Sequence, residues 1–323
     1  MKVAINGFGR IGRAFLKNTL PYEEIEVVYI NDLSSKENLA YLFNNDSIYR
    51  EKYDFDVNEK GFLFNNNQII FSQEKEIEKL NWKDVDIVIE ATGVFREKEI
   101  LKKYLNLGVK KVILTSTFKD SQDISLLGIN DSDKSIISNG SCTTNAVANF
   151  LNILDKEIGV KKAVLNTIHA YTANQNLVDN ASKDFLRGRN ANLNIIPTTT
   201  NAALAVTNSL KNLKDKFNGL SVRVPVACGS LADVTFVSNK PTSKEEIQKI
   251  ILKNIQKDEY ADLISANYSL VSSDIIQTSF LGIIDLDLIQ VVDKDLIKIC
   301  VWYDNEWGYA YSLVLQVLKN KLN

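Results

Sequence analysis

The chain contains few of the residues that bind metals. Its 323 residues include three cysteines, Cys142, Cys228 and Cys300, and a single histidine, His169. The cysteines lie far apart, are odd in number and show no metal-ligand spacing, so we expect no metal site. Such sparse use of cysteine is typical of a reducing compartment, and we expect a cytoplasmic protein.

Long apolar runs and an excess of charge are also missing. No apolar run reaches the roughly 18–20 residues of a membrane span, so we expect no membrane segment. Met1 leads directly into the strand-like run Val3–Ile5, and we therefore expect no signal peptide. Lysine and arginine total 38 against 40 aspartates and glutamates, a formal net charge of −2. This near-balance argues against non-specific binding to nucleic acid, which requires a basic excess.

The N-terminal segment predicts a strand, a glycine turn, a helix and a second strand. Lys2–Asn6 and Ile25–Ile30 are strand-like, and Arg13–Leu20 has helical content and stops at Pro21. The turn, GFGRIG at residues 7–12, has the GxGxxG spacing of dinucleotide-binding proteins. The bare spacing also occurs in ordinary glycine turns, but here it follows a strand and opens a helix.

The three glycines of this turn have different predicted tasks. Gly7 permits the tight turn, Gly9 lets the backbone approach a pyrophosphate, and Gly12 lets the helix pack on the strand. Asp32 lies twenty residues after Gly12, at the end of the second strand. A carboxylate there can accept hydrogen bonds from a ribose diol and repels a 2′-phosphate, which favours NAD over NADP. The alternative is a solvated aspartate without a ligand.

Further strands and a helix predict an open parallel sheet with crossover helices. The strand-like runs are Val85–Ala91, Lys111–Thr115 and Ser135–Ser138, and Lys98–Asn106 has a helical pattern. Ligands bind at the carboxyl ends of such strands. Thr92 and Gly93 follow one strand and Ser116 follows another, so they are candidates for the cofactor side; ordinary loop residues are the alternative.

A thiol stands where a long helix is predicted to begin. Cys142 lies in Ser-Asn-Gly-Ser-Cys-Thr-Thr-Asn, residues 138–145, and Val147–Ile158 continues as a helix. The partial positive charge and free N–H groups of a helix start lower a thiol's pKa and favour the nucleophilic thiolate. His169, which follows the strand-like run Ala163–Ile168, is the one imidazole that could act as its base. A cysteine near a helix start is more often structural, which is the competing interpretation.

The second half predicts a mixed, mainly antiparallel sheet, because strand-like runs outnumber helices. Arg223 is a cation on an otherwise apolar run, and Thr172 follows His169 closely, so the two could form a phosphate site. A salt-bridged surface arginine is the alternative. The strand-like runs are Leu220–Val226, Ala232–Val237 and Leu296–Tyr303; helices are expected over Ser243–Gln256 and about Glu306–Leu322; and 171–194 is a long polar segment.

With these motifs in place, the chain resembles the phosphorylating, tetrameric glyceraldehyde-3-phosphate dehydrogenases nearly end to end. The motifs that carry the resemblance are INGFGRIGR at 5–13, ND at 31–32, ATG at 91–93, SCTTN at 141–145, HAYT at 169–172, NIIPTTT at 194–200, RVP at 223–225 and YDNEWGY at 303–309. The combination of SCTTN with HAYT at this separation is very specific for the family.

The resemblance implies a role for each matching residue. Cys142 is the nucleophile and His169 its base. The cofactor-contacting positions are Gly7, Gly9, Arg10, Ile11, Gly12, Asp32, Thr92, Gly93, Ser116 and Asn305, of which Asn305 holds the nicotinamide carboxamide. The substrate- and phosphate-contacting positions are Ser141, Thr143, Thr172, Thr200, Asn201 and Arg223. The segment 171–194 matches the loop that packs near the cofactor of a neighbouring subunit in a homotetramer.

The resemblance also implies an α/β architecture of two domains. Residues 1–141 form a Rossmann-type domain with a parallel sheet that binds NAD, and the terminal helix, 306–323, packs back on it. Residues 142–305 form an α+β catalytic domain with a mainly antiparallel sheet. The implied reaction is the NAD-dependent oxidation of glyceraldehyde 3-phosphate with inorganic phosphate, giving 1,3-bisphosphoglycerate through a cysteine thioester, as in glycolysis and gluconeogenesis.

Some residues depart from the family pattern and leave alternatives open. Asn201 and Leu204 stand where the family has Gly and Lys, and Asn180-Ala181 replaces a Leu-Pro pair associated with strict use of NAD. The nearest rival activity is erythrose-4-phosphate dehydrogenase, which has the same fold and catalytic pair. A semialdehyde dehydrogenase is more distant, and a binding or surface-adhesion protein that has kept the fold is the alternative from another class.

Overall fold

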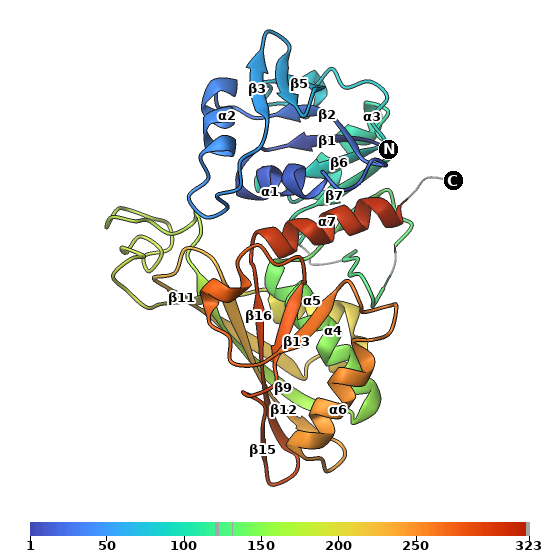
Figure 1. The fold of residues 1–323 in the computed structure, drawn as a ribbon, viewed down its shortest axis with the longest axis vertical. Coiled ribbons are helices and arrows are strands. Elements are labelled where there is room, and N and C mark those ends of the chain that lie inside the picture. The colour runs from blue at the N-terminus through green and yellow to red at the C-terminus, as the bar shows by residue number, and fades with distance from the viewer. Residues whose placement is uncertain (120–122, 131, 321–323) are drawn as a thin grey trace. The chain divides into compact units, whose positions relative to one another are not determined.

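The computed structural model describes residues 1–119, 123–130 and 132–320. The chain divides into two compact units, each with its own eight-stranded sheet (Figure 1). The first unit comprises Met1–Ser125, Ser132–Gly140 and Ala310–Asn323, and the second comprises Leu126–Asp131 and Ser141–Tyr309. Among the helices of the described part of the chain, none is long and apolar enough to cross a membrane.

The sheet of the first unit has the strand order β3-β4-β5-β2-β1-β6-β7-β8. All neighbours from β5 to β8 pair in parallel, whereas β3, β4 and β5 pair antiparallel. The predicted Rossmann-type sheet is therefore confirmed, with an antiparallel extension at one edge. Its strands are β1 (Lys2–Asn6), β2 (Glu26–Asn31), β3 (Phe55–Asn58), β4 (Gly61–Phe64), β5 (Asn67–Ser72), β6 (Ile87–Glu90), β7 (Lys111–Leu114) and β8 (Ile136–Ser138).

The helices of the first unit begin and end where local capping allows. α1 (Arg10–Asn18) starts three residues before the predicted Arg13, because Gly9 is its N-cap and the Arg13 amide donates to the Gly9 carbonyl at 3.0 Å. α3 (Lys98–Asn106) has the predicted limits. α2 (Lys36–Asn44), capped by Ser35, and the short 3₁₀ turn η1 (Ile77–Lys79) had no counterpart in the prediction.

An aromatic cluster fixes the loop between β1 and α1. Phe8 is fully buried, and its ring centroid lies 5.9 Å from those of Phe43 and Phe55 and 5.8 Å from that of Phe62. These partners come from α2, β3 and β4. Offset aromatic pairs at this separation stabilise a core beyond their buried area. The glycine turn is therefore anchored at its centre by a side chain that points into the core.

The second unit is built on the sheet β10-β11-β9-β12-β16-β14-β13, with β15 paired to β16. Most pairs are antiparallel, and β9–β11 and β13–β14 are parallel, so the predicted mainly antiparallel sheet is confirmed. The strands are β9 (Val160–Ala170), β10 (Ile196–Thr199), β11 (Phe217–Val224), β12 (Ser230–Ser238), β13 (Ile264–Asn267), β14 (Gly282–Asp285), β15 (Gln290–Val292) and β16 (Leu296–Tyr303).

Three helices belong to this second sheet, and Figure 1 shows α4 and α6 running beside it. α4 (Cys142–Glu157) begins at the cysteine itself, because the Ser141 hydroxyl accepts from the Thr144 amide and caps the helix. α6 (Lys244–Asn254) begins with a capping box formed by Ser243 and Glu246. The remaining elements are α5 (Ala202–Ser209) and the 3₁₀ turns η2 (Lys211–Leu213) and η3 (Ser272–Ile275).

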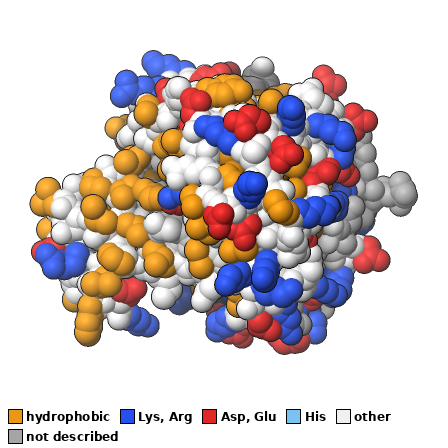
Figure 2. Space-filling model, turned by 90° about the horizontal axis from the view of Figure 1, so that it is seen from below, with side chains coloured by type: hydrophobic (Ala, Val, Ile, Leu, Met, Phe, Trp, Pro, Cys, Tyr) orange, Lys and Arg blue, Asp and Glu red, His pale blue; other side chains and the backbone are white. Residues whose placement is uncertain are grey.

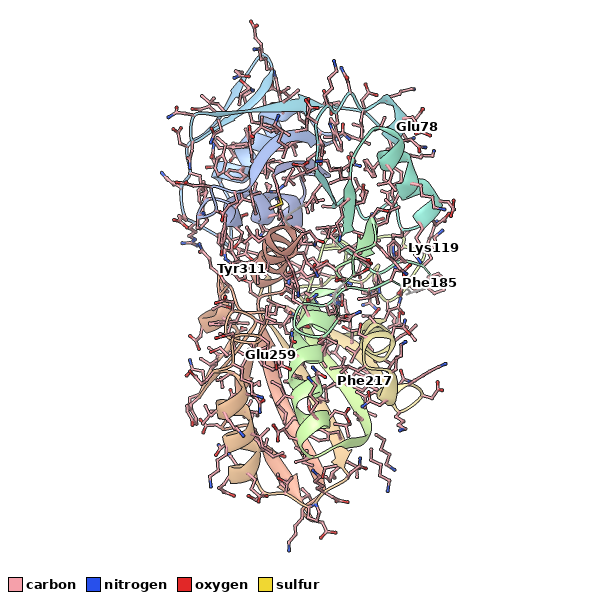
Figure 3. The ribbon with its side chains drawn as sticks, turned by 90° about the vertical axis from the view of Figure 1, so that its right-hand side faces the viewer. Glu78, Lys119, Phe185, Phe217, Glu259 and Tyr311 are labelled. Atoms are coloured by element: carbon pink, nitrogen blue, oxygen red, sulfur yellow. The ribbon has the colours of Figure 1, made fainter. Side chains whose placement is uncertain are left out.

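The terminal helix α7 (Trp307–Lys319) joins the first unit from Ala310 onward. The Tyr311 hydroxyl, labelled in Figure 3, lies 3.1 Å from that of Tyr22. Asn139 Nδ2 donates to Ser312 Oγ at 2.7 Å, which ties β8 to the same helix. The predicted end of this helix, residues 321–323, lies outside the described residues.

Candidate active site

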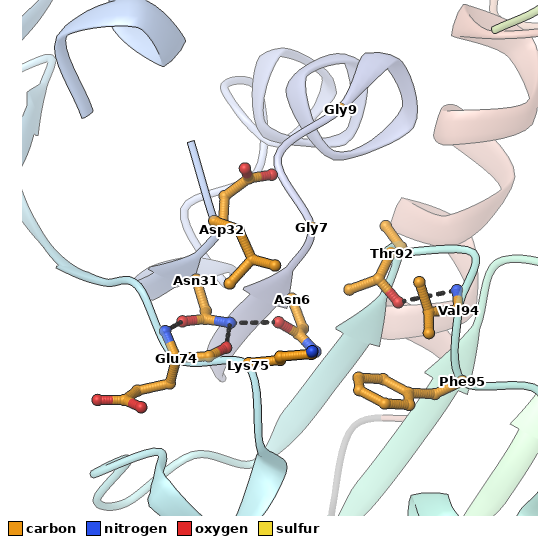
Figure 4. A pocket seen from close by; sticks show the side chains of 12 residues that line it. Asn6, Gly7, Gly9, Asn31, Asp32, Glu74, Lys75, Thr92, Val94 and Phe95 are labelled. Atoms are coloured by element: carbon orange, nitrogen blue, oxygen red, sulfur yellow. Dashed lines mark hydrogen bonds between the residues drawn. The ribbon is translucent and has the colours of Figure 1, made fainter. Parts of the chain in front are cut away.

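A pocket of about 360 Å³ lies at the carboxyl ends of β1, β2 and β6 in the first unit (Figure 4). Parallel strands of this kind bind ligands at this edge. The pocket is lined by Asn6, Gly7, Gly9, Asn31, Asp32, Leu33, Glu74, Lys75, Ala91, Thr92, Val94 and Phe95. Several residues that were predicted to contact a cofactor therefore meet in one place.

The three motif glycines are each required for a different reason. Gly7 has φ +92°, and a Cβ there would lie 2.6 Å from the Thr92 nitrogen. A Cβ on Gly12 would lie 2.3 Å from the Gly7 carbonyl oxygen, so α1 could not pack this closely on the turn. A Cβ on Gly9 would meet nothing within 4 Å. Because Gly9 lines the pocket, its missing side chain leaves open backbone at a helix start, which suits a pyrophosphate.

Asp32 is held in place by two backbone amides. Its Oδ2 accepts from the Phe8 amide at 2.8 Å and its Oδ1 from the Ser34 amide at 2.9 Å. The carboxylate lines the pocket beside the glycine turn (Figure 4). These contacts fix a negative charge at the end of β2, where the sequence predicts the ribose diol.

Of the other predicted cofactor residues of this unit, some line this pocket and others do not. Thr92 lines the pocket, and Gly93 follows it with φ +71°. The Ser116 Oγ is buried and has no hydrogen-bond partner among the described residues. Arg10 pairs with Asp46 at 2.7 Å and lies over the ring of Tyr49. Ile11 is partly buried and does not line the pocket.

A buried polar network beneath this pocket was missed by the sequence analysis. Glu90, at the end of β6, is fully buried and accepts from Asn6 Nδ2 at 2.9 Å, from the Tyr104 hydroxyl at 2.6 Å and from the Thr92 amide at 2.9 Å. Burial raises the pKa of Glu90, although these donors oppose the shift. Asn31 Nδ2 donates to Asn6 Oδ1 at 2.7 Å and extends the network to β2. The sequence signal that could have revealed this network is Glu90 itself, a charged residue at the end of an apolar strand.

In the second unit, Cys142 and His169 are in direct contact. Cys142 is the first residue of α4, and His169 is the penultimate residue of β9. The Cys142 Sγ lies 3.4 Å from His169 Nε2, and the His169 ring is buried edge-on against Tyr303. This arrangement brings a thiol and an imidazole within hydrogen-bonding reach, as a nucleophile and its base require.

Burial dominates the electrostatics of this pair. It raises the pKa of the Cys142 thiol, opposed by the Arg223 charge and by hydrogen bonding with Thr143. Burial and then the Arg223 charge lower the pKa of His169 to about 3. Backbone hydrogen bonding at the helix start does lower the thiol pKa as predicted, but desolvation of the anion outweighs it and the net pKa is raised.

Arg223 lies beside the pair, and no carboxylate of the described residues pairs with it. It stands opposite His169 in the pairing of β11 with β9, and its Nη1 donates to the Ala170 carbonyl at 2.9 Å. The Arg223 Nε is buried without a partner, and Arg223 forms no ion pair within the described residues. Its pKa is lowered by burial first and then by the charge of Arg187. A buried guanidinium with an unused donor has the chemistry to bind an anion.

Arg187 was not identified from the sequence. It comes from the polar segment 171–194, donates to Thr198 Oγ1 from Nε at 3.1 Å and from Nη2 at 3.0 Å, and pairs with Asp184 at 3.2 Å. This segment contains neither helix nor strand. Without regular periodicity, no sequence pattern connects Arg187 to Arg223.

The predicted phosphate-contacting hydroxyls already have partners in the second unit. The Thr143 Oγ1 lies 2.9 Å from the Tyr303 hydroxyl, and Ser141 caps α4. The Thr172 amide and hydroxyl both donate to Gln175 Oε1, at 2.9 and 3.1 Å.

Thr200 and Asn201 precede α5. The Thr200 Oγ1 accepts from the Ala202 amide at 3.1 Å. Asn201 has φ −94° and ψ 6°, so this turn needs no glycine even though the family has one there. The replacement therefore leaves the backbone of this segment unstrained.

Asn305 has a fixed amide orientation. Its Oδ1 accepts from the Ser230 hydroxyl at 2.9 Å and from the Gly229 amide at 3.2 Å. The Ser230 Oγ in turn accepts from the Ala170 amide at 3.1 Å, next to His169. Asn305 and the end of β9 are thus linked through one buried hydroxyl.

The other two cysteines are structural in character. The Cys228 Sγ donates to Asp304 Oδ1 at 3.3 Å, and Cys300 is buried on β16 with a pKa raised to about 11 by burial and the Asp233 charge. Within the described ranges, no group of three or more His, Cys, Asp or Glu is placed to hold a metal ion.

Two protein-family descriptions match most of the chain. The family described as "Glyceraldehyde 3-phosphate dehydrogenase, NAD binding domain" matches residues 1–98, and "Glyceraldehyde 3-phosphate dehydrogenase, C-terminal domain" matches residues 141–305. The chain belongs to the glyceraldehyde-3-phosphate dehydrogenase family. It is 38% identical to glyceraldehyde-3-phosphate dehydrogenase 2 of Bacillus subtilis, over 97% of this chain and 95% of that protein.

Other relatives are similar over the same range. The chain is 39% identical to the glyceraldehyde-3-phosphate dehydrogenases of Mycobacterium avium and Thermotoga maritima, over 97% of this chain and 96% and 97% of those proteins. The family predicted from the sequence is confirmed, and with it an oxidoreductase of this family that uses NAD. The family acts on a phosphorylated aldehyde together with phosphate.

Proposed function

We propose that the chain oxidises glyceraldehyde 3-phosphate to 1,3-bisphosphoglycerate through a thioester on Cys142, with NAD and inorganic phosphate as co-substrates. The observation that carries the proposal is the 3.4 Å contact between Cys142 Sγ and His169 Nε2, beside the Arg223 guanidinium, whose buried Nε has no hydrogen-bond partner among the described residues. This constellation joins a nucleophile, a base and an anion site.

Each residue has a definite chemical task. Cys142 sulfur attacks the aldehyde carbon, and the new hydroxyl forms next to His169 Nε2, which removes its proton. The backbone N–H of Cys142, at the first turn of α4, has no intrahelical acceptor and can stabilise the developing oxyanion. NAD, when bound, supplies the hydride acceptor. Inorganic phosphate then attacks the thioester carbon, and the Cys142 thiolate leaves.

The two anion sites that this reaction needs are assigned to the polar residues around the pair. Arg223, assisted by Arg187, supplies positive charge. The hydroxyls and amides that complete the sites come from Ser141, Thr143, Thr172, Thr200 and Asn201. Because the hydroxyls of Ser141, Thr143 and Thr172 have protein partners, they must reorient to donate to phosphate.

The cofactor is assigned to the pocket of the first unit. Gly7, Gly9 and Gly12 shape the pyrophosphate cradle, and Asp32 receives the ribose diol. Further contacts are assigned to Arg10, Ile11, Thr92, Gly93, Ser116 and Asn305. Residues 1–141 together with the terminal helix form the domain that we assign to NAD binding, and residues 142–305 form the domain that we assign to catalysis.

A cytoplasmic homotetramer is the assembly we propose. In the polar segment and just after it, Val178, Phe185, Leu193 and Ile195 are 71% exposed or more. Phe185 lies at the surface in Figure 3, and Figure 2 shows apolar side chains gathered on one flank. Exposed apolar patches of this kind mark protein–protein contacts. Sedimentation at micromolar concentration should therefore give a tetramer, and a monomer would contradict the assembly without affecting the chemistry.

A steady-state assay tests the function directly. NADH formation should require inorganic phosphate, and glyceraldehyde 3-phosphate should be turned over with a higher kcat/KM than erythrose 4-phosphate. Cys142→Ser should abolish turnover, whereas the matched Cys300→Ser should retain it. A preference for erythrose 4-phosphate would assign the rival dehydrogenase activity, and absence of turnover on either would leave a binding role.

A further inference from the structure

A series of side-chain hydrogen bonds runs across the ends of β2, β1 and β6 and finishes at Glu90. Asn31 is oriented by the backbone, because its Oδ1 accepts from the Glu74 amide at 2.8 Å. Asn31 Nδ2 therefore donates to Asn6 Oδ1, at 2.7 Å (Figure 4). Asn6 Nδ2 in turn donates to Glu90 Oε2 at 2.9 Å. Because each amide group has one accepting and one donating end, the direction of every bond in this series is fixed.

Two hydroxyl groups and one more amide also donate to the Glu90 carboxylate. The Tyr104 hydroxyl lies 2.6 Å from Oε2 and accepts from Asn6 Nδ2, so its own hydrogen is left for Glu90. The Thr92 hydroxyl accepts from the Val94 amide at 3.1 Å (Figure 4), so its hydrogen is left for Oε1. The Thr92 amide donates to Oε1 as well, at 2.9 Å. Glu90 thus receives four hydrogen bonds, and a proton on either of its oxygens would face donors.

This arrangement fits an ionised carboxylate that is stabilised by hydrogen bonds and not by a cation. Glu90 is fully buried, and no lysine or arginine of the described residues pairs with it. Tyr104 on α3 is the titratable side chain in contact with it, and burial and the Glu90 charge raise the pKa of that phenol. The titratable groups of the adjoining pocket are Asp32, Glu74 and Lys75. The four donors therefore supply the stabilisation that a buried charge requires.

Glu90 itself is not among the residues that line the pocket, but the groups that it holds are. The chain turns directly after Glu90, and Thr92, Val94 and Phe95 form one wall of the pocket. The segment 74–75 forms another wall and is tied to Glu90 through the two asparagine amides. One buried carboxylate thus connects two walls that belong to segments far apart in the sequence.

We infer that Glu90 is a positioning residue for the cofactor, whose negative charge holds both walls in the arrangement that binds NAD without touching the ligand. When Glu90 takes up a proton from solvent, at least one of its four donors loses an acceptor. The turn 92–95 is then released and the affinity for NAD falls. This inference rests on the assignment of the pocket to NAD in the proposed function.

Glu90→Gln tests the role of the charge, because glutamine has the shape of the protonated side chain. Its Nε2 cannot accept from Asn6 or Thr92, so at pH 8 calorimetry should show NAD binding about 10–100-fold weaker, as expected when one hydrogen bond to a charged group is lost. Burial raises the pKa of Glu90, so the wild type should itself lose the charge as the pH is lowered. The two affinities should therefore converge towards pH 5. Titration of Asp32 or Glu74 affects both proteins and cancels in their ratio.

Two further variants keep the test decisive even if Glu90→Gln folds poorly. Tyr104→Phe keeps the charge but removes one donor, so the loss of NAD affinity should move to higher pH by about 1–2 units. Asp86→Asn is the matched control, because Asp86 stands at the opposite end of the same strand, where it accepts from the Lys2 amide and pairs with Lys110. It should bind NAD as the wild type does.

The outcomes separate this inference from the assignment of the pocket. Equal affinities of Glu90→Gln and wild type at pH 8, a ratio of the two that does not change with pH, or an unmoved pH profile in Tyr104→Phe would overturn the inference. If Gly9→Ala weakens NAD binding while Glu90→Gln does not, the inference alone fails. If neither substitution weakens NAD binding, the assignment of the pocket to NAD fails with it.

Discussion

Replacing Asp32 by asparagine should let the enzyme accept a dinucleotide with a 2′-phosphate. In the wild type the carboxylate is tied to the Phe8 and Ser34 amides. NADP can therefore bind in two ways. Either the carboxylate stays and repels the phosphate, or it rotates away and loses both amide hydrogen bonds.

The two routes have comparable costs. Hydrogen bonds to a charged group contribute roughly 1.5–3 kcal/mol each, so losing two costs about 3–6 kcal/mol. Two unit charges about 4 Å apart at an effective dielectric near 20 repel by about 4 kcal/mol before screening. The cheaper route sets the penalty, at about 3–4 kcal/mol. This predicts a preference for NAD of roughly 10²–10³-fold.

The assay is the ratio of kcat/KM with NAD to that with NADP. Asp32→Asn keeps an oxygen acceptor for one amide but removes the charge, so the ratio should fall to within about tenfold, most of the ~3–4 kcal/mol being lost. Glu74→Gln is the matched control, because Glu74 lines the same pocket while its carboxylate points away from that of Asp32 (Figure 4). It should leave the ratio unchanged. A wild type that uses both cofactors equally, or an Asp32→Asn ratio equal to the wild-type ratio, would refute the reasoning.

The remaining predictions concern reactivity, folding and cofactor binding. Iodoacetamide at neutral pH should modify Cys142 first, because this thiol is partly exposed whereas Cys300 is buried; mass spectrometry maps the sites, and the reverse order would contradict the proposed nucleophile. His169→Asn should slow single-turnover hydride transfer about 10²–10⁴-fold. The His169 pKa is about 3 in the folded protein and about 6.5 in the unfolded chain, so below pH 7 the unfolded chain binds a proton that the folded protein does not. The wild type should therefore lose more free energy of unfolding than His169→Asn between pH 7 and pH 5. Equal losses in thermal unfolding would argue against burial of the ring. Gly12→Ala should lower the free energy of unfolding by about 1–3 kcal/mol through overpacking. Gly9→Ala should weaken NAD binding in calorimetry with less effect on folding. A Gly9→Ala protein that binds NAD with normal affinity would contradict the assignment of Gly9 to the pyrophosphate.

The sequence predicts well what short-range rules control. The motif glycines, the start of α4 at Cys142 and the limits of α3 follow from turn, capping and helix propensities that act over a few residues. The placement of Asp32 at the pocket also follows, because a strand end fixes it. These features need no knowledge of distant segments.

What could not be predicted depends on pairing between distant segments. Arg223 meets His169 because β11 pairs in parallel with β9, and no local pattern specifies that register. The antiparallel strands β3 to β5 were missed because their alternation is short and interrupted by turns. The net rise of the thiol pKa could not be predicted, because desolvation depends on the whole surrounding fold, whereas the helix end is visible in the sequence.

The buried ring of Phe8 has a consequence for how tightly a dinucleotide can be held. A flexible glycine turn would lose conformational entropy when a ligand orders it, and that loss would be subtracted from the affinity. Here the turn is fastened at its midpoint into the aromatic cluster of α2, β3 and β4. The glycine turn is therefore already ordered when the unit has folded, before any ligand binds. The hairpin β3–β4 contributes to cofactor affinity in this way without contacting the cofactor pocket. Loosening that hairpin should then appear as a faster release of NAD rather than as a change in any group that touches it.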